Sequence, residues 1–414
     1  MKKIWYTLIP LMLLVSCKGG LSENPKPSPS EEPQPTEQDS ADPSEDQIIQ
    51  EGDFTILAWS DIVDPSAAEW KYEKLLEAGF DTYLGWYDTF DKVEKSLEAA
   101  DKTGLKLIIN HTDIYSNLEK EVNSMKSHPS LAGYHIKDEP EVTDFPDLAE
   151  KIASILRYDA EHPCYVNLYP NWAWGGEVVY RSKVDLFLKK VPVKFLSFDN
   201  YPIRTIGGEA QLRPDWYHNL EDISAAAKDA GIPFWGFALA LAHNTKEAYY
   251  RVPTLGDLRL QQFSNMVYGA VGFQYFTTWG LIQDGGVVEP VYGRIKTVNS
   301  ELRSLSRLFC GATIKNIWHT GATIPHGTKK LDTLPEGITA LKTEETGAVV
   351  SFFTKGNRQY IAVVNKNMDG GMDLEISFAD GVEAKSVSKD LSETPFSPGK
   401  IRLPAGDIAI YSWK

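Results

Sequence analysis

Two adjacent carboxylates stand at the end of an apolar run in the stretch GYHIKDEP, residues 133–140. The run from Gly133 to Ile136 is typical of a buried strand, and Asp138 and Glu139 follow it directly before a proline. Carboxyl groups placed there could exchange protons with a substrate or bind its hydroxyl groups. The alternative is a capping pair on the loop after the strand, with no chemical role.

Seven further apolar runs end in polar or aromatic residues. In chain order the eight ends carry Trp59, Ser60 and Asp61; Trp86 and Tyr87; Asn110 and His111; Asp138 and Glu139; Asn167, Tyr169, Asn171 and Trp172; Asp199, Asn200 and Tyr201; His243 and Asn244; and Tyr275, Thr278 and Trp279. Aromatic rings stack on the apolar faces of sugars, amides and carboxylates bind hydroxyls, and a carboxyl can protonate a glycosidic oxygen. These ends therefore predict a poly- or oligosaccharide as the partner.

Alternating strands and helices must position these side chains. Between residues 53 and 312, eight apolar runs alternate with segments of helical periodicity, which indicates a parallel sheet. Eight such units over this length predict a (β/α)₈ TIM barrel, in which chemistry takes place at the carboxyl ends of the strands. The competing interpretation is an open doubly wound sheet, but no glycine-rich phosphate loop follows the first run.

The pattern changes after the last helical segment. Short apolar runs separated by turn residues occupy residues 313–414, and they predict a small antiparallel β-sandwich. The predicted fold is thus α/β, with a TIM barrel followed by this second domain.

Three motifs resemble known enzymes. GYHIKDEP, SFDNYP and FQYFTTWG are similar to the clan A glycoside hydrolases, and in particular to the family 42-like barrel enzymes found as lipoproteins in Bacteroides-type bacteria. The resemblance covers residues 53–414. It implies that Glu139 is the general acid/base and that Asp138 replaces an asparagine that binds a sugar hydroxyl. It also implies that Trp279 forms a platform for the sugar.

One departure from that family concerns the second carboxylate. The family places a nucleophilic glutamate at the end of strand seven, whereas FWGFALALAHN here has no carboxylate before Glu247. Glycoside hydrolysis usually requires two carboxyl groups. Asp199 is the best substitute, although it could instead orient Tyr201. We expect burial to raise the pKa of Glu139, and Asp199 to stay ionised in a more polar setting. The weaker alternatives are Glu289, Asp284, Glu247 and Asp61.

The remaining strand-end residues are predicted to bind substrate. Each has a structural alternative: His111 could be an ordinary hydrogen-bonding histidine, and any of the tryptophans could pack under a loop. If the barrel has lost its nucleophile, the protein is instead a non-catalytic carbohydrate-binding lipoprotein; a polysaccharide lyase is a third possibility. The predicted binding residues are Asp138, Trp86, Asn110, His111, Asn167, Tyr169, Trp172, Tyr201, Tyr275 and Trp279.

The N-terminal residues indicate the compartment. Residues 1–17 combine two lysines, a short apolar run and Leu-Val-Ser-Cys, which resembles the lipobox of bacterial lipoproteins. We expect Cys17 to be lipidated and residues 18–52, rich in Pro, Ser and Glu, to form a disordered linker. Lys18 favours the outer membrane, and the lipid is the only membrane contact expected.

Charge and cysteine content limit the other partners. The net charge of −15 argues against nucleic acid. Cys164 and Cys310 are the cysteines left after Cys17, and two buried thiols are a simpler reading than a disulfide. No metal-binding sequence motif is present, so neither a metal nor another cofactor is predicted.

Overall fold

The computed structural model describes residues 47–48, 54–60, 65–245 and 248–414. Asp61, Glu247, Cys17 and the predicted signal segment lie outside the described residues, as does most of the predicted linker. None of the helices in the described part of the chain is long and apolar enough to cross a membrane.

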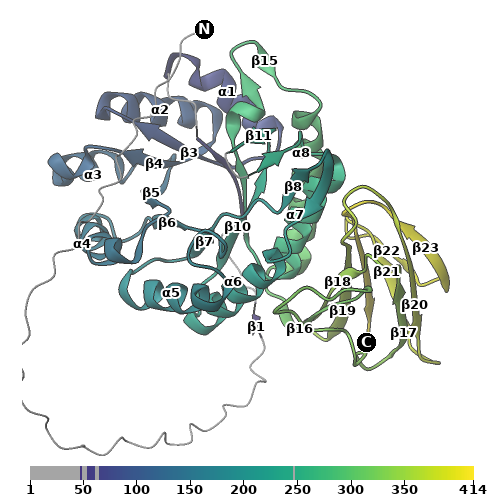
Figure 1. Ribbon diagram of the computed structural model, residues 1–414. Helices are drawn as coiled ribbons and strands as arrows, with labels where there is room; N and C mark the ends of the chain where they lie inside the picture. The colour runs from purple at the N-terminus through teal and green to yellow at the C-terminus, as the bar shows by residue number, and fades with distance from the viewer. Residues whose placement is uncertain (1–46, 49–53, 61–64, 246–247) are drawn as a thin grey trace, which may run out of the picture. The chain divides into compact units, whose positions relative to one another are not determined.

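Eight parallel strands close into a barrel, which confirms the predicted fold (Figure 1). The neighbouring order is β10-β13-β2-β3-β4-β5-β6-β7, so the first strand of the barrel pairs with the last. The strands are β2 (Thr55–Trp59), β3 (Thr82–Tyr87), β4 (Lys106–His111), β5 (Leu131–Asp138), β6 (Cys164–Leu168), β7 (Leu196–Phe198), β10 (Phe234–Leu239) and β13 (Gly272–Phe276).

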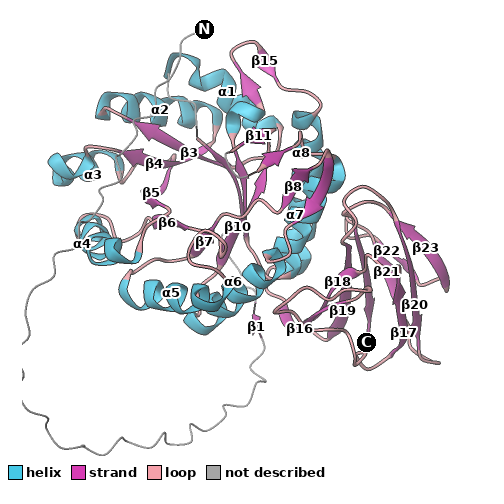
Figure 2. Ribbon diagram, in the orientation of Figure 1, coloured by secondary structure: helices cyan, strands magenta, loops and turns pink. Residues whose placement is uncertain are grey.

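Eight α-helices surround the strands (Figure 2). Apolar residues at helical spacing pack these helices against the barrel. Helix α7 is buried on nearly all sides, because it also contacts the C-terminal sheets. They are α1 (Pro65–Glu77), α2 (Phe90–Thr103), α3 (Leu118–Met125), α4 (Phe145–Leu156), α5 (Glu177–Lys190), α6 (Trp216–Ala230), α7 (Leu255–Val267) and α8 (Val291–Phe309). Three 3₁₀ turns, η1 (Ile114–Ser116), η2 (Val142–Asp144) and η3 (Thr278–Gly280), lie in the loops after β4, β5 and β13.

Short strands that the sequence did not predict lie in the loops after β7, β10 and β13. A hairpin of β8 (Ile203–Ile206) and β9 (Glu209–Leu212) joins β11 (His243–Asn244) and β12 (Tyr249–Tyr250) in a four-stranded antiparallel sheet. A second hairpin is formed by β14 (Ile282–Gln283) and β15 (Gly286–Val287). The loops that follow strands of a barrel line its catalytic end, so these additions shape the candidate site.

The C-terminal region consists of two antiparallel sheets around a shared core. Apolar side chains of both sheets meet there, among them Ile361, Leu374 and Trp413. The larger sheet contains β1 (Gln47–Ile48), β16 (Thr313–His319), β18 (Ala348–Lys355), β19 (Arg358–Asn365), β24 (Ile408–Trp413), β21 (Lys385–Val387) and β22 (Glu393–Pro395). The smaller contains β17 (Ile338–Thr343), β20 (Met372–Phe378) and β23 (Gly399–Leu403).

Strand β1 departs from the sequence-based expectation. Gln47 and Ile48 fall within the predicted linker, yet they pair with Ile314 and Thr313 at the edge of the larger sheet. Two residues give too short a pattern to recognise as a strand, and the edge of β16 supplies the hydrogen-bonding partner.

Charged side chains connect the barrel to the sheets. Arg259 of α7 pairs with Glu301 of α8 and with Asp407, which precedes β24. Lys389 also contacts both carboxylates, each at 2.8 Å. The helix pair α7 and α8 is therefore the surface of the barrel on which the C-terminal sheets pack.

The two described cysteines, Cys164 and Cys310, do not form a disulfide with each other. Cys164 is buried as expected, whereas Cys310 is partly exposed.

Candidate active site

A β-bulge in β5 determines which way the paired carboxylates point. His135 pairs with Tyr165, and Asp138 pairs with Asn167. Between these two pairs β5 spans three residues and β6 spans two, so β5 contains one extra residue. In a regular strand His135 and Lys137 would share a face, because side chains alternate with period two. The bulge shifts this alternation, so that Asp138 takes the inward position and Lys137 is exposed.

The backbone at Glu139 is strained. Its φ angle is +47°, in the left-handed region that costs a non-glycine residue about 1–3 kcal/mol. Its amide still donates to the carbonyl oxygen of Asn167, at 2.9 Å, so the strand pairing continues to the end of β5. Strain of this kind persists where the surrounding structure enforces it, and such positions cluster at functional sites.

The Asn167 side chain bridges two carboxylates. Its amide nitrogen lies 3.1 Å from Asp138 Oδ1 and 3.4 Å from Asp199 Oδ1. Its amide oxygen accepts a hydrogen bond from Ser197, at 2.9 Å, which fixes the orientation of the amide. Asp138, Asn167 and Asp199 therefore lie together across β5, β6 and β7.

Buried polar side chains inside the barrel form a hydrogen-bond network that leads to Asn167. Gln274 donates to the Ser197 hydroxyl, at 2.9 Å, and accepts from the Tyr165 hydroxyl, at 2.5 Å. The ring of Tyr165 packs edge-on against Trp59, and Trp59 packs against Phe237 in the same way. Ser197 and Gln274 were not predicted as site residues; the available signal was a polar residue inside an otherwise apolar strand.

Burial raises the pKa of all three carboxyl groups, and neighbouring negative charge adds to it for Glu139 and Asp199. Burial, and next the negative charge of Asp138, raises the pKa of Glu139 to about 7, which agrees with the expectation. The expectation that Asp199 stays readily ionised is wrong. Burial first, and then the charges of Glu139 and Asp138, raise its pKa well above the usual range for an aspartate. Burial raises the pKa of Asp138 as well, opposed by the Asn167 hydrogen bond. Groups coupled in this way lose their protons in separate steps, and the apparent pKa values belong to the group rather than to single residues.

Two tyrosines border this group of acids. Burial, and then the charges of Asp199, Asp138 and Glu139, raise the pKa of Tyr201, whose ring lies 5.6 Å from Phe276. Burial, and next the charge of Glu139, raise the pKa of Tyr169. Both rings are partly exposed, so they can contact a bound molecule beside the carboxylates.

Trp172 is covered on one face by a cation. The guanidinium of Arg213, after the β8–β9 hairpin, lies 4.2 Å from the centre of its ring. Arg213 also pairs with Asp215, at 3.4 Å. None of the predicted strand-end residues is a lysine or arginine; the hairpin, which was not predicted, precedes this arginine.

Three predicted binding residues lie at the adjacent strands β3 and β4. Trp86, Asn110 and His111 line a cavity of about 250 Å³ that reaches the side of α4. Asn110 hydrogen-bonds the buried His135, at 2.8 Å, and burial lowers the pKa of that histidine to about 3. His111 is buried and paired with Glu121, at 3.3 Å, so its position fits the structural alternative.

The last strand places its two candidates differently. Trp279 lies in η3 at the carboxyl end of β13, and 41% of its surface is exposed. Tyr275 is fully buried and its ring meets Phe80 edge-on, at 5.4 Å. Gln274 faces the barrel interior, so its neighbour Tyr275 must face the helices. We therefore leave Tyr275 out of the candidate site.

The described alternatives to Asp199 stand apart from the acids. Asp284 is exposed and pairs with Lys71, at 2.9 Å. Glu289 accepts a hydrogen bond from the backbone of Gly293, at 3.2 Å. Among the described residues, Asp199 is thus the candidate that shares a hydrogen-bond partner with Asp138.

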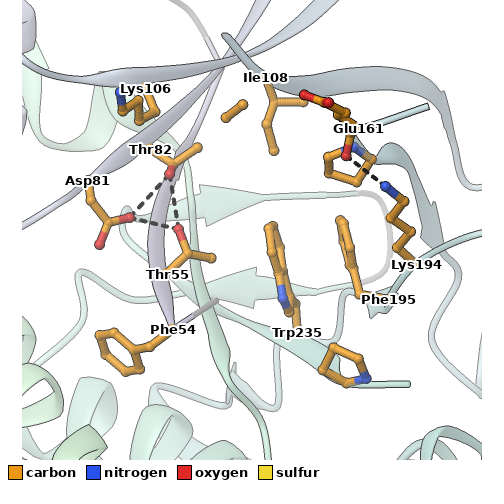
Figure 3. A pocket seen from close by; sticks show the side chains of 13 residues that line it. Phe54, Thr55, Asp81, Thr82, Lys106, Ile108, Glu161, Lys194, Phe195 and Trp235 are labelled. Carbon is orange, nitrogen blue, oxygen red and sulfur yellow. Dashed lines mark hydrogen bonds between the residues drawn. The ribbon is translucent and has the colours of Figure 1, made fainter. Parts of the chain in front are cut away.

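A larger cavity, of about 540 Å³, lies at the opposite end of the barrel (Figure 3). It is lined by residues at the amino ends of the strands, including Thr55, Thr82 and Lys106. The rings of Phe195 and Trp235 stack inside it, 3.9 Å apart. Its lining contains none of the predicted site residues, and this end of a barrel serves stability rather than chemistry.

Comparisons with known proteins give remote structural neighbours. No protein-family model matches the sequence, and no curated protein matches it. A GH30 endoxylanase from Clostridium papyrosolvens C71 is similar with 13% identity and a TM-score of 0.45, over 89% of this chain and 98% of that one. An α-amylase from Anoxybacillus has 11% identity and a TM-score of 0.46, over 87% and 97%.

A third neighbour has a different activity. A truncated 3-deoxy-D-arabino-heptulosonate 7-phosphate synthase from Thermotoga maritima has 13% identity and a TM-score of 0.39, over 62% of this chain and 88% of that one. Likenesses this remote do not bear on function, and the barrel assignment rests on the strand pairing itself.

Proposed function

We propose that this protein is a glycoside hydrolase acting on a poly- or oligosaccharide. The observation that carries the proposal is the group of three carboxyls at the carboxyl ends of β5 and β7, where Glu139 has a pKa of about 7. A carboxyl with that pKa is still substantially protonated at neutral pH and can donate a proton to a leaving oxygen.

The roles follow from position and charge. Glu139 is the general acid. Asp199 is the second carboxylate because it shares the Asn167 amide with Asp138; it must lose its proton against its raised pKa before it acts as nucleophile or base. Asp138 and Asn167 bind hydroxyls of the substrate next to the bond that breaks. Tyr169, Tyr201 and the exposed Trp279 provide rings on which sugar units stack.

A specific observation favours a second candidate, a carbohydrate-binding protein without catalysis. Strand β10 is followed by Ala240 and Leu241, so this described position offers no carboxylate. In that case the aromatic residues bind sugar, but no pair of carboxyl groups hydrolyses it.

One experiment separates the two candidates. The purified protein is screened against polysaccharides for both binding and release of reducing ends. Glu139→Gln tests the acid, and Glu141→Gln, an exposed glutamate two residues later, is the matched control. A hydrolase loses product formation in Glu139→Gln alone while still binding. Binding without product in the wild type would contradict the hydrolase.

We also propose that the protein is an outer-membrane lipoprotein anchored through Cys17. The support is the N-terminal sequence, with its short apolar run and Leu-Val-Ser-Cys. Replacing Cys17 with Ser should move the protein from the membrane fraction to the soluble fraction. A mutant that remains in the membrane fraction would contradict the anchor.

A further inference from the structure

Two histidines and a glutamate from distant parts of the chain converge on the outside of the barrel. Glu177 is the first residue of α5, His218 lies in the first turn of α6, and His326 lies in the connection between β16 and β17. Glu177 Oε2 is 3.2 Å from His218 Nδ1 and 2.9 Å from His326 Nδ1. One nitrogen or oxygen atom of each residue lies within 4.8 Å of those of the other two.

The two separations from Glu177 are close to those between the ligand atoms of a metal centre. With bonds of about 2.0–2.2 Å to histidine nitrogen and carboxylate oxygen, the ligand atoms of a tetrahedral zinc site lie about 3.3 Å apart. We propose that Glu177, His218 and His326 bind a Zn²⁺ ion, with water as the fourth ligand. The sequence offered no motif for this site because the ligands come from three separate segments.

Unsatisfied polar atoms support the assignment. Among the described residues, Asp222 Oδ2 is buried and has no hydrogen-bond partner, and His218 Nδ1 makes no hydrogen bond although Glu177 Oε2 lies 3.2 Å away. Asp222 lies one turn further along α6, and its carboxylate is 3.9 Å from His218 Nε2. At 3.9 Å Asp222 makes no hydrogen bond to the ring, but its negative charge favours a cation beside it.

The backbone of the connection is shaped to approach His218. Gly327 has φ +75°, and a Cβ atom there would lie 2.4 Å from the imidazole ring of His218. Glycine at this position therefore lets the connection lie directly against the ring and brings His326 toward Glu177. The bound ion would fasten this connection, which belongs to the C-terminal region, to helices α5 and α6 of the barrel.

Zinc titration of the full protein tests the site. Chelator-treated wild type is titrated with ZnCl₂ by calorimetry, beside His326→Ala, Glu177→Gln and the control His128→Ala. His326 has an exposed side chain, so its loss leaves the fold intact. We expect His326→Ala and Glu177→Gln to weaken zinc binding at least about tenfold, and His128→Ala to bind as the wild type does. Zinc should raise the Tm of the wild type but not that of His326→Ala.

Two results would overturn the proposal. One is a wild type that binds no Zn²⁺; the other is equal zinc affinity in the wild type and His326→Ala. Either would mean that the three residues form an ordinary group of ion pairs. Cobalt gives an independent readout, because Co²⁺ held by these ligands has visible absorption bands that must be absent in His326→Ala.

Discussion

At the scale of single residues, Glu139 combines two unfavourable features. Its backbone is in the left-handed region, and its carboxyl is buried beside Asp138. The left-handed backbone could not be read from the sequence, because it depends on the residues that the barrel brings around the end of β5, whereas the raised pKa was expected. The role of Glu139 as the acid stays a prediction, which rests on the resemblance of GYHIKDEP to the clan A motif.

The raised pKa of Glu139 predicts how its removal affects stability. An unfolded glutamate titrates near 4.5 and the folded one near 7, so the folded protein binds this proton more tightly. The resulting stabilisation is complete below about pH 4.5 and is lost as the pH rises through about 7. Glu139→Gln cannot titrate, so it should become more stable relative to wild type over this range. Allowing for partial exposure, the gain is about 1–2 kcal/mol.

Thermal unfolding from pH 4.5 to about 7.5 measures this effect. The Tm of Glu139→Gln minus that of wild type should increase with pH. The same scan of Glu141→Gln is the control for a substitution at a nearby exposed glutamate. A constant or falling difference for Glu139→Gln would show that its carboxyl is not held protonated by its surroundings.

At the scale of elements, the sequence predicted where the barrel strands lie along the chain. It predicted less well which of their side chains face the barrel interior. The carboxyl ends of parallel strands meet at one end of a barrel, so the strand-end residues had to gather there. The bulge in β5, however, turns Asp138 inward through its pairing with β6, which depends on a neighbour distant in sequence. Tyr275 was predicted to bind substrate, but it faces the helices. Which residues of β13 face inward can be told only from their contacts, such as the hydrogen bond of Gln274 to Ser197.

Ser197 tests whether the barrel interior positions the acids. Ser197→Ala removes the donor to the Asn167 amide oxygen and leaves that buried oxygen unsatisfied. We expect a loss of about 1–3 kcal/mol in unfolding free energy and lower activity, although Ser197 does not itself reach the substrate. Ser351→Ala is the matched control, because Ser351 is a buried strand serine with no hydrogen-bond partner. Equal losses of stability and activity in Ser197→Ala and Ser351→Ala would contradict a positioning role of Ser197.

At the scale of the whole molecule, the barrel and the C-terminal sheets share a close contact. Gly256, in the first turn of α7, packs against the backbone of Met368 and against Ala405. The division between a barrel and a β-sandwich was foreseeable from the change in periodicity, whereas this contact was not. It requires a glycine in a helix, where the sequence alone would favour alanine.

Gly256→Ala measures the contribution of that contact. Alanine favours a helix over glycine by about 1 kcal/mol, so an isolated helix would become more stable. Here the new Cβ would lie 2.6 Å from the Met368 carbonyl oxygen, and we expect the Tm to fall instead. Gly285→Ala is the control, because a Cβ there meets nothing within 4 Å. A Gly256→Ala variant with a higher Tm than wild type would contradict the close packing of α7 on the sheets.

The central claim is that Glu139 donates a proton to the leaving oxygen of a glycoside. Its most direct test compares kcat/KM of wild type and Glu139→Gln on an oligosaccharide and on the dinitrophenyl glycoside of the same sugar. We predict a loss of about 10²–10⁴ on the oligosaccharide, whose leaving oxygen needs the proton. The loss on the aryl glycoside, whose leaving group departs without one, should be much smaller. Equal losses on the two substrates, or full activity of Glu139→Gln on the oligosaccharide, would contradict the role assigned to Glu139.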